Sequence, residues 1–348
     1  MNRRTVSALV FCLSVIPHVT AFAQGQAELN PDVSVVPDIR ARMGDATPHD
    51  LDFAVGQVEL GLQANLNPFT RGDVFFRVGD GEIELEEGFA TFTALPAGLG
   101  LRVGKYRAAA GRFNSAHGHS FPFLEYPLLV TQFFGPRGLD EVGLNPSVLL
   151  DFGAFPVTLS ADVLSRAPDD TATSDPPREI SDLVYNGRLS AFLTLLGGTS
   201  FIELGASGGT MVVDIASDLR ATWVGVDGKF KWRPNPRTGV DVAGEFLAQR
   251  RKVTGGGSDT PAGALGYFNY LFWGNWNIGG LAEYVQLASN SDLNQKGFAL
   301  FAGYSIREQT TVIRMLLRND DLPGNLGNET GVQLQLVTGL GKHRPHDF

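Results

Sequence analysis

The chain has 348 residues, one cysteine, a formal net charge of −9 and a mean hydropathy of −0.01. The acidic balance argues against a nucleic-acid partner, and one cysteine cannot build a disulfide framework or a thiolate metal site. No stretch of about 18 uncharged apolar residues follows the N-terminal region, which excludes membrane-spanning helices. The same composition is compatible with a transmembrane β-barrel, because its strands need only every second residue to be apolar.

The N-terminal residues have the pattern of a secretory signal peptide: a basic start, an apolar run over 6–16 and a small-x-small sequence at 21–23. We expect residues 1–23 to be removed after export. Cys12 lies inside this segment, so the mature chain is expected to carry neither a thiol nor a lipid anchor. Residues 24–31 then form a short periplasmic lead.

Alternating apolar and polar residues dominate the rest of the chain, as expected for β-strands with two unlike faces. In the clearest segment Leu60 and Leu62 share one face. Glu59 and Gln63 lie on the opposite face. The pattern predicts an all-β fold, a transmembrane antiparallel β-barrel over 32–341, with about sixteen strands and fourteen as the next choice. The expected strands lie near 32–40, 57–66, 73–79, 82–95, 99–108, 139–152, 156–165, 184–196, 199–213, 219–232, 239–250, 263–274, 279–289, 296–306, 313–318 and 332–340.

The expected connections alternate between short and long, as in outer-membrane barrels with short periplasmic turns and longer extracellular loops. Short, turn-like pieces lie at 67–68, 96–98, 153–156, 197–198, 234–238, 275–279 and near 308. Longer polar pieces lie at 109–138, 166–183, 253–262, 290–295 and 319–330.

The longest segment outside the expected strands is 109–138, the third loop on the rim predicted to be external. A loop of this length is either functional or disordered, and its many apolar side chains argue against disorder. These side chains need a surface to pack on. The interior of the barrel or a neighbouring subunit would provide one.

Two histidines, His117 and His119, flank Gly118 in this loop. Imidazoles at i and i+2 on an extended segment point the same way and can bind Zn²⁺ or Cu²⁺ when a carboxylate or a third imidazole joins them. The commoner arrangement for such a pair is two polar side chains hydrogen-bonded within a folded loop. The spacing alone leaves both interpretations open.

Charged residues form two runs beside this loop. The basic run is Arg102, Lys105, Arg107 and Arg112, and the acidic run is Glu82, Glu84, Glu86 and Glu87. Opposing charges at a constriction set the ion preference of a porin, so both runs are candidates for the lumen, together with Glu59 and Gln63. A solvated rim explains the two runs equally well, because breaks in the alternation near Gly88 and Gly104 leave their inward faces undetermined.

Several motifs around this loop are similar to those of a known group. They are Leu101–Arg107, Gly111–Asn114, His117–His119 and Gly138–Gly143. The chain resembles porin-like outer-membrane proteins of environmental bacteria, some of them labelled zinc-regulated outer-membrane receptors, and more loosely the phosphate-selective porins. The resemblance implies a barrel with a pore and a third loop that folds inward. A receptor with a plug domain needs a barrel of about 22 strands, for which this chain has no room.

Pattern and resemblance favour a porin-like channel in the bacterial outer membrane for passive diffusion of small hydrophilic solutes or ions. The alternatives are a zinc-linked uptake or receptor barrel and a soluble exported β-sandwich binding protein. No enzymatic activity is expected, because a Ser–His–Asp set on the lipid-facing side is not recognisable. No cofactor is expected either, apart from zinc at His117 and His119.

The expected partners are outer-membrane lipid, the permeating solutes or ions, and further copies of the chain in a homotrimer. The barrel-assembly machinery is a fourth, because the tail 342–348 ends in Phe348, the terminal aromatic by which such barrels are recognised.

Overall fold

The computed structural model describes residues 31–45, 47–79, 81–153, 155–165, 179–253, 255–306 and 311–341. These residues belong to one compact unit, Pro31–Phe348. The predicted signal peptide, most of the predicted lead and the C-terminal tail with Phe348 lie outside the described residues.

The described residues form sixteen long strands in one antiparallel sheet, together with the two-residue strands β12 (Ser258–Asp259) and β18 (Leu340–Gly341). The long strands are β1 (Asp32–Gly44), β2 (Thr47–Asn67), β3 (Thr70–Gly79), β4 (Glu82–Leu95), β5 (Leu99–Arg107), β6 (Asp140–Asp151), β7 (Pro156–Leu164), β8 (Val184–Leu195), β9 (Ser200–Asp214), β10 (Leu219–Asn235), β11 (Thr238–Val253), β13 (Ala262–Phe272), β14 (Trp276–Leu287), β15 (Asn290–Ile306), β16 (Thr311–Asp321) and β17 (Asn328–Thr338).

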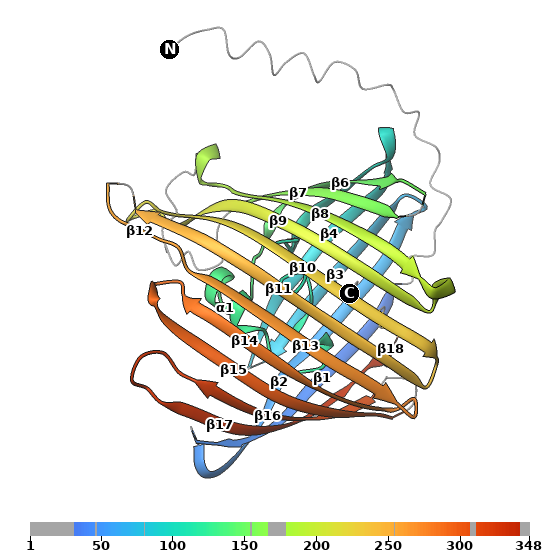
Figure 1. Ribbon diagram of the computed structural model, residues 1–348. Coiled ribbons are helices and arrows are strands. Elements are labelled where there is room, and N and C mark those ends of the chain that lie inside the picture. Colours follow the sequence, from blue (N-terminus) through green and yellow to red (C-terminus); the bar gives the residue numbers. More distant parts are fainter. Residues whose placement is uncertain are drawn as a thin grey trace. The chain divides into compact units, whose positions relative to one another are not determined.

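Each long strand pairs with the next along the chain, and the last pairs with the first, so the sheet closes into a barrel (Figure 1). At the closing seam Asp38 of β1 lies opposite Val337 of β17. Closure satisfies the backbone hydrogen-bonding groups of both edges, which is the condition for a sheet in lipid. The prediction of a sixteen-stranded antiparallel barrel is confirmed, and the β-sandwich alternative is wrong.

The polarity of the two faces of the barrel wall is the reverse of that in a soluble protein, with apolar side chains outside and charged side chains inside. On β10, Val224 and Val226 are 63% and 57% exposed, whereas Asp227 and Lys229 on the other face are 7% and 8% exposed. Apolar side chains on the outside and charged ones on the inside are typical of a wall that faces lipid outward and a polar lumen inward.

Some strands are longer than the alternation indicates. β1 continues to Gly44, and its Pro37 is tolerated because a β-bulge follows at Asp38 and Ile39. The expected loop 290–295 is wrong, since these residues belong to β15 and pair with β14. Strands that project beyond the membrane no longer need apolar residues on their outer face, which removes the signal used to define their ends.

Residues 108–139 join β5 to β6 and contain the helix α1 (Leu128–Phe134) and a 3₁₀ turn (Gly118–Ser120). Two further 3₁₀ turns, Pro96–Gly98 and Leu196–Gly198, join strands on the opposite rim, and a fourth, Ile180–Asp182, precedes β8. Among the described residues no helix is long and apolar enough to cross a membrane.

Candidate functional site

The segment 108–139, called the third loop below, packs its apolar side chains on the inner wall of the barrel. Phe134 meets Trp223 of β10 edge to face, with ring centroids 5.3 Å apart, and Phe123 lies 6.3 Å from Phe301 of β15. α1 packs on β13 and β14 (Figure 1). Each buried phenylalanine contributes about 1.5–3 kcal/mol by leaving water. The aromatic density noted in the sequence is therefore the core of a loop attached to the wall.

The base of the third loop is closed by one buried amide. Asn114 Nδ2 donates to the carbonyl oxygens of Ala108 and Leu139 at 2.8 and 3.1 Å, and Asn114 Oδ1 accepts from the Leu139 N–H at 2.7 Å. Asn114 thus joins the first and last residues of the loop. Both N–H groups of this amide and one of the two lone pairs of its oxygen are engaged within the loop itself, so the loop enters and leaves the wall at one fixed point.

Wall carboxylates hold the loop backbone. Glu245 of β11 accepts the N–H groups of Arg112 and Phe113 at 2.8 and 3.0 Å, and Glu283 of β14 accepts that of Leu128 at 2.8 Å. Gly111, with φ of +108°, lies against Glu245 so closely that a Cβ would collide with the carboxylate. Charge-assisted bonds of this kind are about twice as strong as neutral ones.

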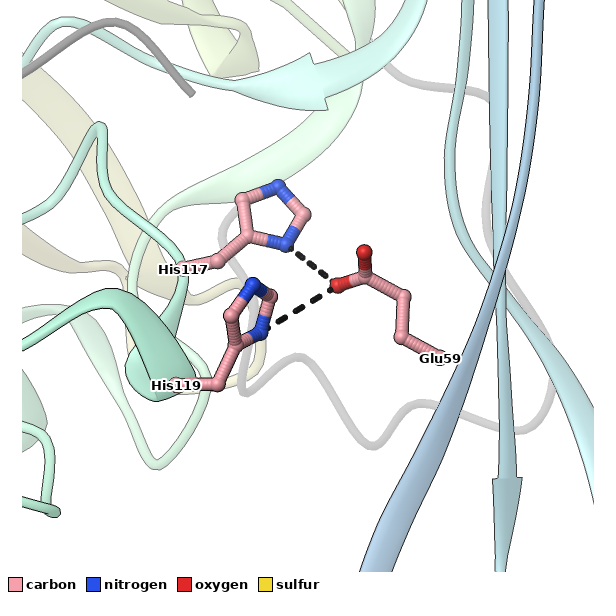
Figure 2. A group of neighbouring side chains, drawn as sticks. All are labelled: Glu59, His117 and His119. Carbon is pink, nitrogen blue, oxygen red and sulfur yellow. Dashed lines mark hydrogen bonds and ion pairs between the residues drawn. The ribbon is translucent and has the colours of Figure 1, made fainter. Parts of the chain in front are cut away.

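On the opposite side of the barrel, His117 and His119 of the loop reach Glu59 of β2 (Figure 2). His117 also reaches β4. His117 Nδ1 lies 2.9 Å from Glu59 Oε2, and His117 Nε2 lies 2.9 Å from Glu87 Oε2. His119 Nδ1 lies 3.5 Å from the same Glu59 oxygen. Burial opposes protonation of His117, but its hydrogen bonds to Glu59 and Glu87 outweigh burial and raise its pKa to about 10 from 6.5. At neutral pH this ring is an imidazolium between two carboxylates.

The same three residues form a donor set that fits a metal ion. One ligand atom each from Glu59, His117 and His119 lies within 4.8 Å of the others, and all three residues are buried. Two imidazoles and a carboxylate suit Zn²⁺, whose ligand distances of about 2.0–2.2 Å need only small movements here. Glu87 would then hold the second nitrogen of His117, as outer carboxylates do for zinc-bound histidines. A metal ion would have to displace the proton on His117 Nδ1.

Beside the loop, the lumen contains a cavity of about 590 Å³. Loop residues 112–122 line one side, and inner-face residues of β8 to β16 line the other. Its ionisable lining is unbalanced, with two acidic side chains, Glu203 and Asp241, against six basic ones: Arg112, Arg188, Lys229, Lys231, Arg233 and Arg314.

Comparison with solved structures agrees with this architecture. The anion-selective porin from Comamonas acidovorans superposes with a TM-score of 0.63 at 11% identity, over 89% of this chain and 99% of that one. The outer-membrane channel DcaP of Acinetobacter baumannii gives 0.60 at 10% identity, over 90% and 97%. The trimer form of OmpT, an outer-membrane protein of Vibrio cholerae, gives 0.60 at 10% identity, over 88% and 98%.

The chain has the porin fold. No family model matches the sequence. An uncharacterised protein of Aquifex aeolicus (strain VF5) is 33% identical over 166 residues, which are 43% of this chain and 34% of that protein. The chain therefore spans about a third of the length of this curated relative. The porin fold with its apolar outer face is that of a bacterial outer-membrane barrel.

Among the predicted lumen residues of this barrel, Glu59 and Gln63 are 1% and 4% exposed on the inner face of β2. Gln63 Nε2 donates to Asp73 of β3 at 2.7 Å. Glu59 belongs to the histidine cluster. The structure therefore brings together four of the sequence-based candidates: Glu59, Glu87, His117 and His119.

The basic run on β5 does not gather around the large cavity. Arg107 is buried between Glu86, at 2.8 Å, and the ring of Tyr126, with its guanidinium carbon 5.1 Å from the ring centroid. Arg102 lies over the Phe89 ring at 4.6 Å, and Lys105 donates to the Leu85 carbonyl oxygen at 2.8 Å. These side chains hold β4, β5 and the loop together.

Arg112 is the member of the basic run that lines the cavity, where its Nη2 lies 2.6 Å from Glu203 Oε1. In the acidic run, Glu82 is exposed at the start of β4 and Glu84 pairs with Arg137 of the loop. The loop serines 115 and 120 donate to backbone carbonyl oxygens, and neither makes a hydrogen bond to an imidazole in the described part of the chain.

Sequence reasoning missed the basic side chains of β8, β10 and β16 that line the cavity. The signal was present on β10, where Lys229, Lys231 and Arg233 follow Asp227 at every second position. The aromatic residues Phe230 and Trp232 that alternate with them predict a strand, but the local sequence does not indicate that its charged face lines a cavity.

Proposed function

We propose that this outer-membrane barrel is a passive channel for small hydrophilic solutes or ions, with the third loop as its constriction. The observation that carries the proposal is the loop's attachment to both sides of the lumen. His117 binds Glu59 and Glu87 on β2 and β4, whereas Arg112 and Phe113 bind Glu245 on β11. A segment held in this way narrows the passage and cannot swing out without breaking buried charge-assisted bonds.

Conductance after cysteine labelling tests the proposal. Because Cys12 lies in the predicted signal peptide, an introduced cysteine is unique in the mature chain. Ser120→Cys places it on the loop beside the cavity, and Ser217→Cys places it in an exposed connection on the outer rim. We expect a bulky thiol reagent to reduce single-channel conductance in planar bilayers for the first variant and not for the second. Equal responses would place the loop outside the permeation path.

Loop removal gives a second test. Replacing residues 117–135 by a short Gly-Ser linker leaves all strands in place, together with the hydrogen bonds of Asn114 to Ala108 and Leu139. We therefore expect a folded, heat-modifiable barrel with larger conductance. Replacing residues 255–257, in another connection on the same rim, is the matched control. Unchanged conductance in a folded loop-removal variant contradicts the constriction.

We infer a second candidate function, metal binding at the loop, from the geometry of Glu59, His117 and His119. Calorimetric titration of the purified barrel with Zn²⁺ is expected to give one site that is lost in His119→Gln and retained in Glu84→Gln, an exposed carboxylate nearby. Affinity is expected to rise with pH, because Zn²⁺ competes with a proton on His117. Equal binding by the two variants would assign the zinc to adventitious surface groups.

The proposal includes a homotrimer, in line with the trimer form of OmpT. Analytical ultracentrifugation in detergent distinguishes it from a monomeric barrel.

A further inference from the structure

The inner face of β10 carries a ladder of basic side chains. Lys229, Lys231 and Arg233 occupy alternate positions, so they share the face opposite Val224 and Val226. At about 3.3 Å of rise per residue, the ladder extends over roughly 13 Å toward the rim of the short turns. Arg314 of β16 lines the same cavity.

The acidic groups next to this ladder are already paired with cations. Asp227 is bound by both terminal nitrogens of Arg188 at 2.6 and 2.9 Å. Glu203 is bound by Arg112 at 2.6 Å, and Asp241 by Arg233 at 2.8 Å. These three carboxylates therefore do not neutralise Lys231 or Arg314.

Lys231 and Arg314 form no ion pair with a carboxylate among the described residues. Lys231 Nζ lies 5.8 Å from the centre of the Phe201 ring. Arg314 Nη1 donates to the His119 carbonyl oxygen at 2.8 Å and to the neutral Gln335 side chain at 3.3 Å. A cation in a cavity with low-dielectric walls acts on a permeating ion with little screening.

Acidic side chains on the β2–β4 wall of the lumen are bound by other side chains away from the cavity. On the β2–β4 wall, Glu59 and Glu87 bind the two ring nitrogens of His117, and Glu86 binds Arg77 and Arg107. By covering the acidic wall, the third loop leaves the basic wall as the charged surface that faces the cavity.

The cavity also offers apolar and neutral polar surface. Phe121 of the loop and Tyr267 of β13 line it, as do the amides Asn269 and Asn277. This combination suits a solute with an anionic end and a small apolar body.

We propose that the cavity is a binding site for small organic anions, whose carboxylate is held by Lys231 and Arg314 while the apolar body lies on Phe121 and Tyr267. The inference rests on the proposed channel function and adds its substrate class. An anion in this position exchanges water for several charge-assisted hydrogen bonds. Passage still requires the site to release the solute, so weak binding with fast exchange is expected.

Reversal potentials under a KCl gradient test the charge preference. The wild-type channel is expected to favour chloride, and the double substitution Lys231→Gln/Arg314→Gln is expected to lower the anion-to-cation permeability ratio several-fold. The double substitution Arg250→Gln/Lys252→Gln, which also removes one arginine and one lysine charge but at exposed positions of β11, is the matched control and should leave the ratio unchanged. A conducting wild type that favours cations, or an unchanged ratio in Lys231→Gln/Arg314→Gln, overturns the inference while the channel function stands.

Benzoate tests the solute class. It is expected to block chloride current in the wild type, with a half-blocking concentration roughly tenfold higher in Lys231→Gln/Arg314→Gln. Neutral benzyl alcohol should not block, and inorganic phosphate should block more weakly than benzoate. Phosphate block as strong as that by benzoate overturns the apolar half of the site.

Two controls distinguish loss of charge from misfolding and failure of the anion site from failure of the channel function. The conservative double variant Lys231→Arg/Arg314→Lys preserves both charges and should retain wild-type selectivity, which distinguishes loss of charge from misfolding. If the barrel does not conduct at all, the channel function fails, and equilibrium titration of the detergent-solubilised barrel with benzoate decides the anion site by itself. Absence of saturable benzoate binding there overturns it.

Discussion

His117 Nδ1 lies 2.9 Å from Glu59 Oε2 and thereby bonds the third loop to a strand 58 residues earlier in the chain. The second ring nitrogen makes an equivalent bond to Glu87 on β4. Both nitrogens must carry protons for both bonds to form with ionised carboxylates. The attachment of the loop to this wall therefore depends on one proton.

This proton predicts a pH dependence. The pKa of His117 in the folded chain, about 10, lies above the ordinary value of 6.5. Its stabilising contribution is therefore complete below about pH 6.5 and is lost as the pH rises through about 10. We expect hydrogen exchange of the third loop to accelerate over this range beyond its intrinsic pH dependence.

The control for that experiment is His117→Gln, which cannot ionise. Glu59, Glu87 and His119 face the ring from β2, β4 and the loop, and Glu86 adds a further negative charge. Removing the cation leaves these carboxylates buried together, at a cost of about 3–5 kcal/mol. An extra acceleration of the same size in the variant would refute the role of His117.

Gly111→Ala should loosen the third loop. Its φ of +108° disfavours any side chain, and the new Cβ would collide with Glu245. Gly98→Ala is the matched control, because Gly98 has φ of +72° and nothing within 4 Å of the added carbon. Protease sensitivity of the loop in the folded barrel is expected to rise for Gly111→Ala alone. Equal sensitivity would mean that backbone strain, and not contact with Glu245, dominates.

The two faces of β2 should respond differently to charge. Leu62 lies on the outer face, and Leu62→Arg near the membrane midplane should cost roughly 2–4 kcal/mol of folding free energy. Gln63→Arg on the inner face should fold normally, since Asp73 lies 2.7 Å from the amide that the arginine replaces. Folding yield into lipid vesicles ranks the two. The reverse order would show that the faces are assigned wrongly.

Phe123→Ala should open a void in the core of the third loop. The ring is fully buried, within 5.5 Å of Tyr267 and 5.1 Å of Phe121 measured between ring centroids. Such truncations cost about 3–5 kcal/mol. We expect higher current noise from an unchanged barrel. Phe152→Ala, at a 60% exposed position beyond β6, should leave the current steady. Quiet channels from both variants would argue against a packed loop core.

The strands could be predicted from the sequence because apolar residues that face lipid alternate with polar residues that face the lumen along every strand. The prediction fails where this alternation shifts by one residue. A β-bulge shifts the register between Phe75 and Phe76 against β4, and Gly104 has φ of +133°. These two irregularities explain why the inward charges of β4 and β5 could not be assigned.

The candidate site could be predicted only in part. His117 and His119 were visible as a pair, but their partners lie in other strands, and Glu245 is separated from Arg112 by 133 residues. Such contacts follow from barrel closure, not from local spacing. The charged inner face of β10 could be predicted from the charges at every second residue. Its role in lining the cavity could be inferred only from the neighbouring strands in the structure.

The pairing of β1 with β17 has a consequence for how the chain reaches its native state. The seam joins segments from near the two ends of the described sequence, so its contacts have the largest loop-closure entropy of any in the sheet. Until the seam forms, both outer strands present open hydrogen-bonding edges that other chains can occupy. The high contact order should make ring closure the slow step, and the yield of refolding should fall as protein concentration rises.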